Sequence, residues 1–133
     1  AGIISCKKSL EETSGDFKKA MALIKERGLV KVAEKAERST GAGYLEAYLH
    51  NNRVGVLLEI RCETDFVARS DVFRELAHNL AMQIAAMNPA DVAHLLSQLY
   101  IKDEAITVEM VIKEAIARLG ENIKVERFCR YEI

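Results

Sequence analysis

The stretch YLEAYLHNNRVGVLLEIRC, residues 44–62, decides the fold. Hydrophobic side chains alternate with other side chains on both sides of Asn51-Asn52, first in residues 44–50 and again in residues 54–62. A period of two is the period of a β-strand, and asparagine tolerates the positive φ angles that a tight hairpin turn requires. The stretch therefore predicts two antiparallel strands joined by a short turn.

A long amphipathic helix is predicted on the C-terminal side of this hairpin. Ser70 or Asp71 supplies its N-cap, and Asn88-Pro89 ends the helical pattern. Between these points the hydrophobic residues recur at the spacing of one helix face: Phe73, Leu76, Ala77, Leu80, Ala81, Ile84 and Ala85.

The remaining C-terminal residues complete a small sheet. Residues 90–99 are compatible with a short helix, and Thr107 and Gly120 are the expected N-cap and C-terminal glycine of a further amphipathic helix. Alternation returns in residues 123–131, which predicts a third strand. The order of the main elements, β-β-α-α-β, contains a hairpin and no βαβ repeat. It predicts an α+β fold, with helices on one face of a small antiparallel three-stranded sheet.

The N-terminal residues are predicted to be helical. Residues 2–13 have helix-forming composition, and Asp16 is the expected N-cap of an amphipathic helix that ends at Gly28. Two short helices cannot bury both of their hydrophobic faces, so this segment belongs to a larger unit or packs against another element. The sequence thus divides into a helical fragment in residues 1–28, a connecting helix and loop in 29–42, and an α+β core in 43–133.

Composition and charge exclude several classes of protein. Half of the 133 residues are hydrophobic, 29% are charged and one is proline, which is typical of a folded chain. The net charge of −1, with acidic and basic residues interspersed, gives no basic face for nucleic acid. No hydrophobic run has the length of a membrane span. We therefore expect neither nucleic acid nor membrane as a direct partner.

The cysteines predict no metal site. Cys6, Cys62 and Cys129 match no zinc-binding spacing and cannot all pair within one chain. Reduced thiols in a cytoplasmic protein are the expectation, with a disulfide between two copies of the chain as the alternative.

No motif predicts catalysis or a cofactor. The three histidines are dispersed, and His78 with Glu75 is interpreted as a solvated pair on one helix. Neither of the glycine-rich phosphate-binding patterns is present. A cysteine-dependent enzyme stays an alternative without a local signature. We predict a protein that is not an enzyme and that holds no metal and no cofactor.

The stretch RCETDFVARSD, residues 61–71, places an aromatic ring where the strand pattern gives way to the helix pattern. Phe66 either turns inward and seals the junction, or stays exposed as a binding anchor. Its polar neighbours favour exposure, and Phe73 already supplies an aromatic side chain to the hydrophobic face of the helix.

The strings CETDFVAR (62–69) and LAMQIAAMNP (80–89) resemble the bacterial elongation factor Ts family, whose members exchange guanine nucleotide on elongation factor Tu. CKKSLEETSGDFKKAMALIKERG (6–28) resembles the later helices of that family's ubiquitin-associated-like N-terminal domain. AIARLGENIKVERFCRYE (115–132) is similar to the end of its short members.

The chain departs from the family pattern in four places. The first helix of the N-terminal domain is missing before Ala1, which we expect of a truncated or processed N-terminus. Residues 89–99 are shorter than the usual helical insertion, and Ile3 and Ile4 replace methionines. Gln83 stands where the family often has a histidine, whose role at the partner surface we expect to be changed here.

The resemblance implies a guanine-nucleotide exchange factor that promotes GDP release from elongation factor Tu during translation elongation. It implies that Asp65 and Phe66 insert between two helices of the nucleotide domain of that partner, near the magnesium and phosphate end of its site. The implied contact residues are Thr64, Asp65, Phe66 and Val67, together with Ile3, Ile4 and Lys7 on the other side. The expected location is the bacterial cytoplasm, or the matrix of an organelle.

Long members of the family carry two related core halves, whereas this chain carries one. A homodimer is therefore expected, formed across the sheet or its neighbouring helices, with the strand ending at Tyr131 and the thiol of Cys129 near the seam. The alternative function is a non-catalytic dimerisation or interaction module of the same fold.

Overall fold

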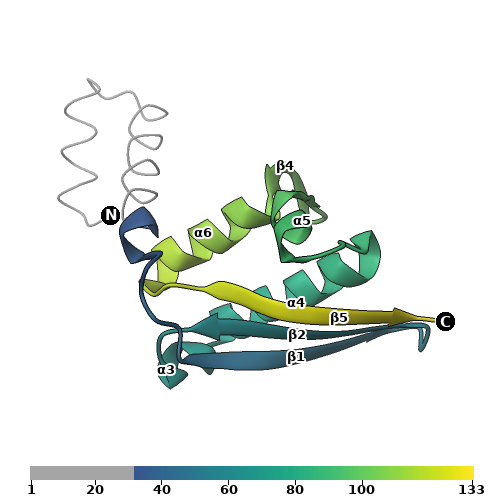
Figure 1. Cartoon of the computed structure of the whole chain (residues 1–133), viewed down its shortest axis with the longest axis horizontal. Coiled ribbons are helices and arrows are strands. Elements are labelled where there is room, and N and C mark those ends of the chain that lie inside the picture. Colours follow the sequence, from purple (N-terminus) through teal and green to yellow (C-terminus); the bar gives the residue numbers. More distant parts are fainter. Residues whose placement is uncertain (1–31) are drawn as a thin grey trace. The chain divides into compact units, whose positions relative to one another are not determined.

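The computed structural model describes residues 32–133 (Figure 1). The chain divides between Ala36 and Glu37, and the larger unit, Glu37–Ile133, contains all the elements described below. The predicted ubiquitin-associated-like helices, with Ile3, Ile4 and Lys7, lie outside the described residues. The three-part division into residues 1–28, 29–42 and 43–133 stays a prediction.

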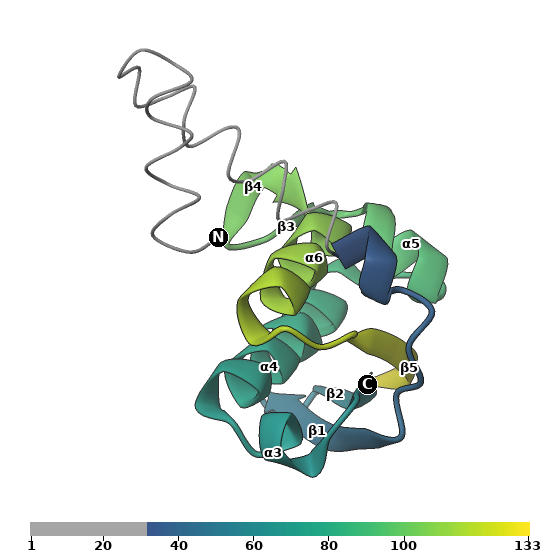
Figure 2. The same ribbon diagram turned by 90° about the vertical axis from the view of Figure 1, so that its left-hand side faces the viewer.

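The larger unit has an α+β fold, as predicted. Its main sheet is antiparallel, in the order β1-β2-β5. The strands are β1 (Ala42–His50), β2 (Val54–Cys62) and β5 (Lys124–Glu132). The helices are α3 (Asp65–Ala68), α4 (Asp71–Met87), α5 (Val92–Ser97) and α6 (Val108–Leu119). Figures 1 and 2 show α4, α5 and α6 on one side of this sheet.

The predicted hairpin is confirmed. Asn51 and Asn52 have φ angles of 51° and 56°, and the Arg53 N–H donates to the His50 carbonyl over 3.0 Å. The register pairs His50 with Val54 at the turn and Ala42 with Cys62 at the far end. The two asparagines thus provide the left-handed turn that aligns both strands.

The buried face of the sheet packs against α4. In β2 the alternating residues Val56, Leu58, Ile60 and Cys62 are buried. The hydrophobic face of α4 lies against them, and its largest fully buried members are Phe73, Leu80 and Ile84. Alternating side chains of a strand lie on opposite sides, so the neighbours of these residues form a second face, called here the outer face.

The predicted helix ends are also confirmed. Ser70, one of two candidate N-caps of α4, accepts a hydrogen bond from the Phe73 N–H at 3.3 Å, and Asn88 ends the helix with a φ of 46°. Thr107 caps α6 by accepting from the Met110 N–H at 3.3 Å, and Gly120 ends it with a φ of 78°. Short polar side chains thus cap the N-terminal ends of these helices, and residues with positive φ angles end them, as the known preferences for helix ends predict.

The structure contains a second, two-stranded sheet that the sequence did not predict. Residues 90–99 contain the short helix α5, and β3 (Leu99–Tyr100) follows it and pairs with β4 (Asp103–Thr107). A strand of two residues is too short to show alternation, which is why the pattern gave no signal.

Gln83 joins α4 to this small sheet. Its side chain is fully buried; Oε1 accepts from the Ile101 N–H at 2.8 Å, and Nε2 donates to the Leu99 carbonyl at 3.0 Å and to Gln98 Oε1 at 3.2 Å. Gln83 therefore lies inside the molecule and offers no side chain to a partner, and the expected change of role at the partner surface stays a prediction.

Replacing Gln83 with leucine is expected to lower the free energy of unfolding by about 1–3 kcal/mol, because the Ile101 N–H and the Leu99 carbonyl lose their partner. Urea denaturation followed by circular dichroism measures this change. Ala86→Leu, at an exposed position of the same helix, is the control and should stay within about 0.5 kcal/mol of the parent. If Gln83→Leu were as stable as the parent, the hydrogen bonds of Gln83 would not stabilise the contact between α4 and the small sheet.

Candidate functional site at the β2–α3 corner

The stretch around Phe66 forms a tight corner between β2 and α4 (Figure 2). Its centre is α3, a helix of one turn that begins directly after the N-cap Thr64. The Thr64 hydroxyl accepts a hydrogen bond from the Val67 N–H at 3.3 Å, and the Thr64 carbonyl accepts from the Ala68 N–H at 3.1 Å. The capping threonine thus sets where this turn begins.

The side chains of α3 point in two directions. Phe66 is 85% exposed and Asp65 is exposed, whereas Val67 is 6% exposed and Ala68 is 5% exposed. Two neighbouring buried residues fix the turn to the core, and the ring on the opposite side is left in solvent. Of the large hydrophobic side chains in residues 32–133, Phe66 has the highest exposed fraction.

The C-terminal end of the corner is also fixed. The Ser70 hydroxyl donates to the Val67 carbonyl over 2.7 Å, and the Ser70 N–H donates to the same oxygen over 3.0 Å. The same hydroxyl accepts from the Phe73 N–H and so caps α4. One serine therefore links the end of α3 to the start of the long helix.

A carboxylate from a distant part of the chain holds the N-terminal end. Glu121 lies in the loop between α6 and β5. Its Oε1 accepts from the N–H groups of Glu63 (3.1 Å) and Thr64 (3.0 Å), and its Oε2 accepts from the Thr64 hydroxyl at 2.7 Å. The sequence reasoning missed this residue. The only signal for it was its position within the family-like string at residues 115–132.

Glu63, directly after β2, binds the backbone of the loop that carries Glu121. Its Oε2 accepts from the Asn122 N–H at 2.6 Å and lies 3.7 Å from the Arg38 guanidinium. The Asn122 side chain in turn donates to the Arg38 carbonyl over 2.9 Å. Each of the two glutamates therefore accepts hydrogen bonds from the backbone of the segment that carries the other.

Cys62 is buried beneath this corner. Its Sγ donates to the Thr64 carbonyl over 3.3 Å, and burial, followed by the nearby negative charge of Glu121, raises its pKa above the ordinary value for a thiol. A raised pKa keeps the thiol protonated, which suits a structural donor and disfavours a nucleophile. Cys62 therefore gives no support to a cysteine-dependent enzyme.

The described residues contain no group of three or more potential metal-ligating side chains. Within the same range, no helix has the length and hydrophobicity needed to cross a membrane. The corner offers a hydrophobic ring beside a carboxylate on a rigid support, which is the form of a protein-binding anchor.

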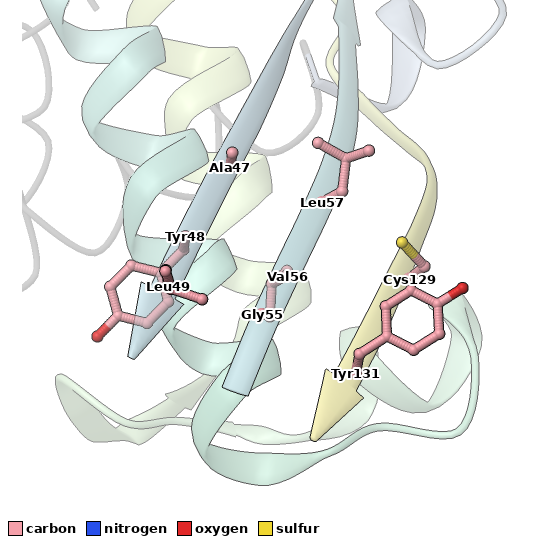
Figure 3. A pocket seen from close by; sticks show the side chains of 8 residues that line it. All are labelled: Ala47, Tyr48, Leu49, Gly55, Val56, Leu57, Cys129 and Tyr131. Carbon is pink, nitrogen blue, oxygen red and sulfur yellow. The ribbon is translucent and has the colours of Figure 1, made fainter. Parts of the chain in front are cut away.

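The outer face of the sheet is a second exposed feature (Figure 3). It presents Leu45, Leu49, Leu57 and Tyr131, which are 60%, 63%, 42% and 76% exposed. A shallow depression of about 360 Å³ lies among the last three of these, and Cys129 is part of its lining. The register places Leu57 between Ala47 and Cys129, at the middle of this face.

Charged side chains occupy the other end of the outer face. Glu59 accepts hydrogen bonds from Nε of Arg127 and Nε of Arg61, both at 2.8 Å. The hydrogen bonds from Arg127 and then Arg61 lower the pKa of Glu59 below its usual value. The outer face therefore has a hydrophobic end and an ion-paired end.

The chain is similar to proteins of known family, and the matched regions include the corner. The family model described as Elongation factor TS matches residues 4–89 and 63–133, and both matches contain the corner. Elongation factor Ts of Thermotoga maritima is 41% identical over 177 aligned positions, which cover 100% of this chain and 89% of the relative. Elongation factor Ts of Thermosipho melanesiensis is 37% identical over 179 positions, covering 100% and 91%.

A chloroplastic elongation factor Ts, from Guillardia theta, is 38% identical over 180 positions, which cover 100% of this chain and 82% of the relative. These alignments are longer than the 133 residues of the chain, so each relative contains segments that have no counterpart here. The matches nevertheless extend over the whole chain. The chain therefore belongs to the elongation factor Ts family of translation elongation factors.

Proposed function

We propose that this protein is a guanine-nucleotide exchange factor that promotes GDP release from elongation factor Tu. The observation that carries the proposal is the exposed ring of Phe66 on a corner fixed at both ends. Membership of the elongation factor Ts family supports elongation factor Tu as the partner. Such a factor makes and breaks no covalent bond and is not an enzyme in that sense.

In the proposed complex, Asp65 and Phe66 insert between two helices of the nucleotide domain of elongation factor Tu. Insertion displaces the groups that hold magnesium and phosphate in that domain. A factor that binds the nucleotide-free partner more tightly than the GDP-bound partner must weaken GDP binding by the same factor. Such an effect on GDP affinity requires no acid or base catalyst.

The ring supplies a large part of the binding energy. Burying an aromatic side chain of about 150–250 Å² at about 25 cal/mol per Å² gives at most about 4–6 kcal/mol. The coupling between two binding sites is typically about 1–3 kcal/mol. Only part of the burial energy therefore weakens GDP binding, and the rest contributes to the affinity for elongation factor Tu. Thr64 and the buried Val67 support the ring from within the corner. Ile3, Ile4 and Lys7 are proposed as a second contact with the same domain.

The test is the release of a fluorescent GDP analogue from purified elongation factor Tu. Adding the chain in increasing amounts should accelerate the release until the rate saturates. A rate that stays at the spontaneous value at every concentration would favour the alternative, a dimerisation or interaction module without exchange activity. The bacterial and chloroplastic relatives support a location in the bacterial cytoplasm or an organelle matrix.

We also propose that two copies of the chain pair through their outer faces. A single soluble chain rarely leaves a continuous hydrophobic patch of this kind open. A two-fold pair brings the same patch of each copy together, so Leu57 lies near the centre of the contact and Cys129 near the seam. β5, which carries Tyr131, is an edge strand, as the order β1-β2-β5 requires.

Replacing Leu57 with glutamate is expected to raise the dissociation constant of the homodimer by about tenfold or more, because a charge is then buried without a partner. Sedimentation velocity at micromolar concentrations measures this change. Leu99→Glu, at an exposed leucine of the small sheet, is the matched control and should leave the dimer intact. Parent chain that sediments only as a 14.9 kDa monomer would contradict the pairing.

A further inference from the structure

We propose that Glu121 is a positioning residue for nucleotide exchange, because its carboxylate fixes the corner that presents Asp65 and Phe66. The inference rests on the proposed exchange function and adds a residue that does not itself need to touch the partner. It is carried by three hydrogen bonds that cross from the α6–β5 loop to the start of α3.

Glu121 binds two backbone N–H groups that lie just past the paired part of β2. The register of β2 with its neighbours ends at Cys62 on one side and at Arg61 on the other. The N–H groups of Glu63 and Thr64 lie beyond the paired region, and no strand partner accepts from them. The Glu121 carboxylate accepts from both, and hydrogen bonds to an ionised acceptor are stronger than neutral ones.

Glu121 also orients the Thr64 hydroxyl. This hydroxyl donates to Glu121 Oε2 at 2.7 Å and accepts from the Val67 N–H at 3.3 Å. Because its one hydrogen is directed at the carboxylate, a lone pair remains available for the helix cap. Donation to an anion also makes the oxygen a better acceptor. Glu121 therefore acts through Thr64 on the turn that carries Phe66.

Hydrogen bonds in both directions connect the α6–β5 loop to the end of β2. Glu63 binds the Asn122 N–H at 2.6 Å, so the loop that carries Glu121 is itself held to the end of β2. Glu121 is half-buried, and both of its carboxylate oxygens are already engaged within the chain. This arrangement suits a residue that holds the corner in place.

Loss of Glu121 should therefore reduce the population of the binding-competent corner. The affinity measured for a partner falls in proportion to the fraction of molecules in the competent conformation, whereas the rate within the complex does not change. We expect Glu121→Ala to raise the concentration needed for half-maximal GDP release by about tenfold, with the saturating rate within about twofold of the parent.

Glu121→Gln should lie between the parent and the alanine variant, because the amide oxygen still accepts from the two N–H groups. Glu126→Ala, a glutamate of β5 that pairs with Lys124 at 3.4 Å, is the matched control and should behave as the parent does. In a protein that already carries Asp65→Ala and Phe66→Ala, adding Glu121→Ala should have no further effect on GDP release.

Amide hydrogen exchange of the free chain gives a readout that does not involve the partner. Glu121→Ala should speed exchange at Val67, Ala68 and Arg69, whose N–H groups donate to oxygens of Thr64 and Asp65, and leave α4 unchanged. Unchanged exchange at these amides would overturn the role of Glu121. An equal loss of GDP release in the parent background and in the background that carries Asp65→Ala and Phe66→Ala would also overturn it. A parent chain that releases no GDP would instead overturn the proposed function itself.

Discussion

Phe66→Ala is expected to fold as the parent does and to lose most of the GDP-release activity. The ring is 85% exposed in the free chain, so its removal takes away little internal packing. In the proposed complex the same ring is buried, and an anchor of this kind accounts for a large share of the binding energy. A loss of about 1–3 kcal/mol of coupling corresponds to an effect on GDP affinity that is about 5–150-fold smaller, and we expect the acceleration of release to fall with it.

The Phe66→Ala variant should keep the stability of the parent while it loses activity. Thermal unfolding followed by circular dichroism should show the variant within about 0.5 kcal/mol of the parent, as is usual for an exposed position. Met87→Ala removes another exposed hydrophobic side chain, at the far end of α4 from the corner, and should leave exchange unchanged. A Phe66→Ala protein that exchanges nucleotide like the parent would show that the ring is not the anchor.

The elements that the sequence predicted well are those whose signals are local. Asn51 and Asn52 formed the hairpin turn because few other residues accept a positive φ angle, and Thr107 and Gly120 set the ends of α6 for equally local reasons. Phe66 was assigned to the surface by its polar neighbours and by Phe73 on the following helix, and the structure confirms that assignment.

Other features of the fold depend on contacts between distant residues, which the pattern of hydrophobic residues along the chain does not show. The alternation in β1 did not say which set of side chains faces the helices, and Leu45 and Leu49 lie on the open side. Glu46 and Tyr48 lie on the side that α4 covers, where His78 contacts both of them. A strand read alone has two equivalent faces, and only packing of the helix distinguishes them.

Glu121 could not be found by reading along the chain, because it lies 57 residues from the threonine it binds. A glutamate that follows a helix-ending glycine is ordinarily interpreted as a solvated loop residue. Its role follows only from the fold, which brings the α6–β5 loop against the end of β2. Val67 is a second residue whose environment the sequence did not show. It lies beside Phe66 in the family string and yet is buried in the core.

Phe73→Ala is expected to have the opposite consequence to Phe66→Ala, although both remove a phenyl ring close to the corner. Phe73 is fully buried in the first turn of α4 and is the largest of the fully buried side chains among the described residues. Removing a buried phenyl ring typically costs about 3–5 kcal/mol, a large part of the about 5–15 kcal/mol that stabilises an ordinary domain. Urea denaturation should therefore show a midpoint far below that of the parent.

Phe73→Leu separates the loss of volume from the loss of the aromatic ring. Because leucine fills most of the space, this variant should recover much of the stability and, with it, the exchange activity. At temperatures where Phe73→Ala is still folded, its activity per folded molecule should approach that of the parent, since the exposed ring is intact. If Phe73→Ala were as stable as the parent while Phe66→Ala unfolded, then Phe66 would be the packing residue, and the corner would hold no anchor for elongation factor Tu.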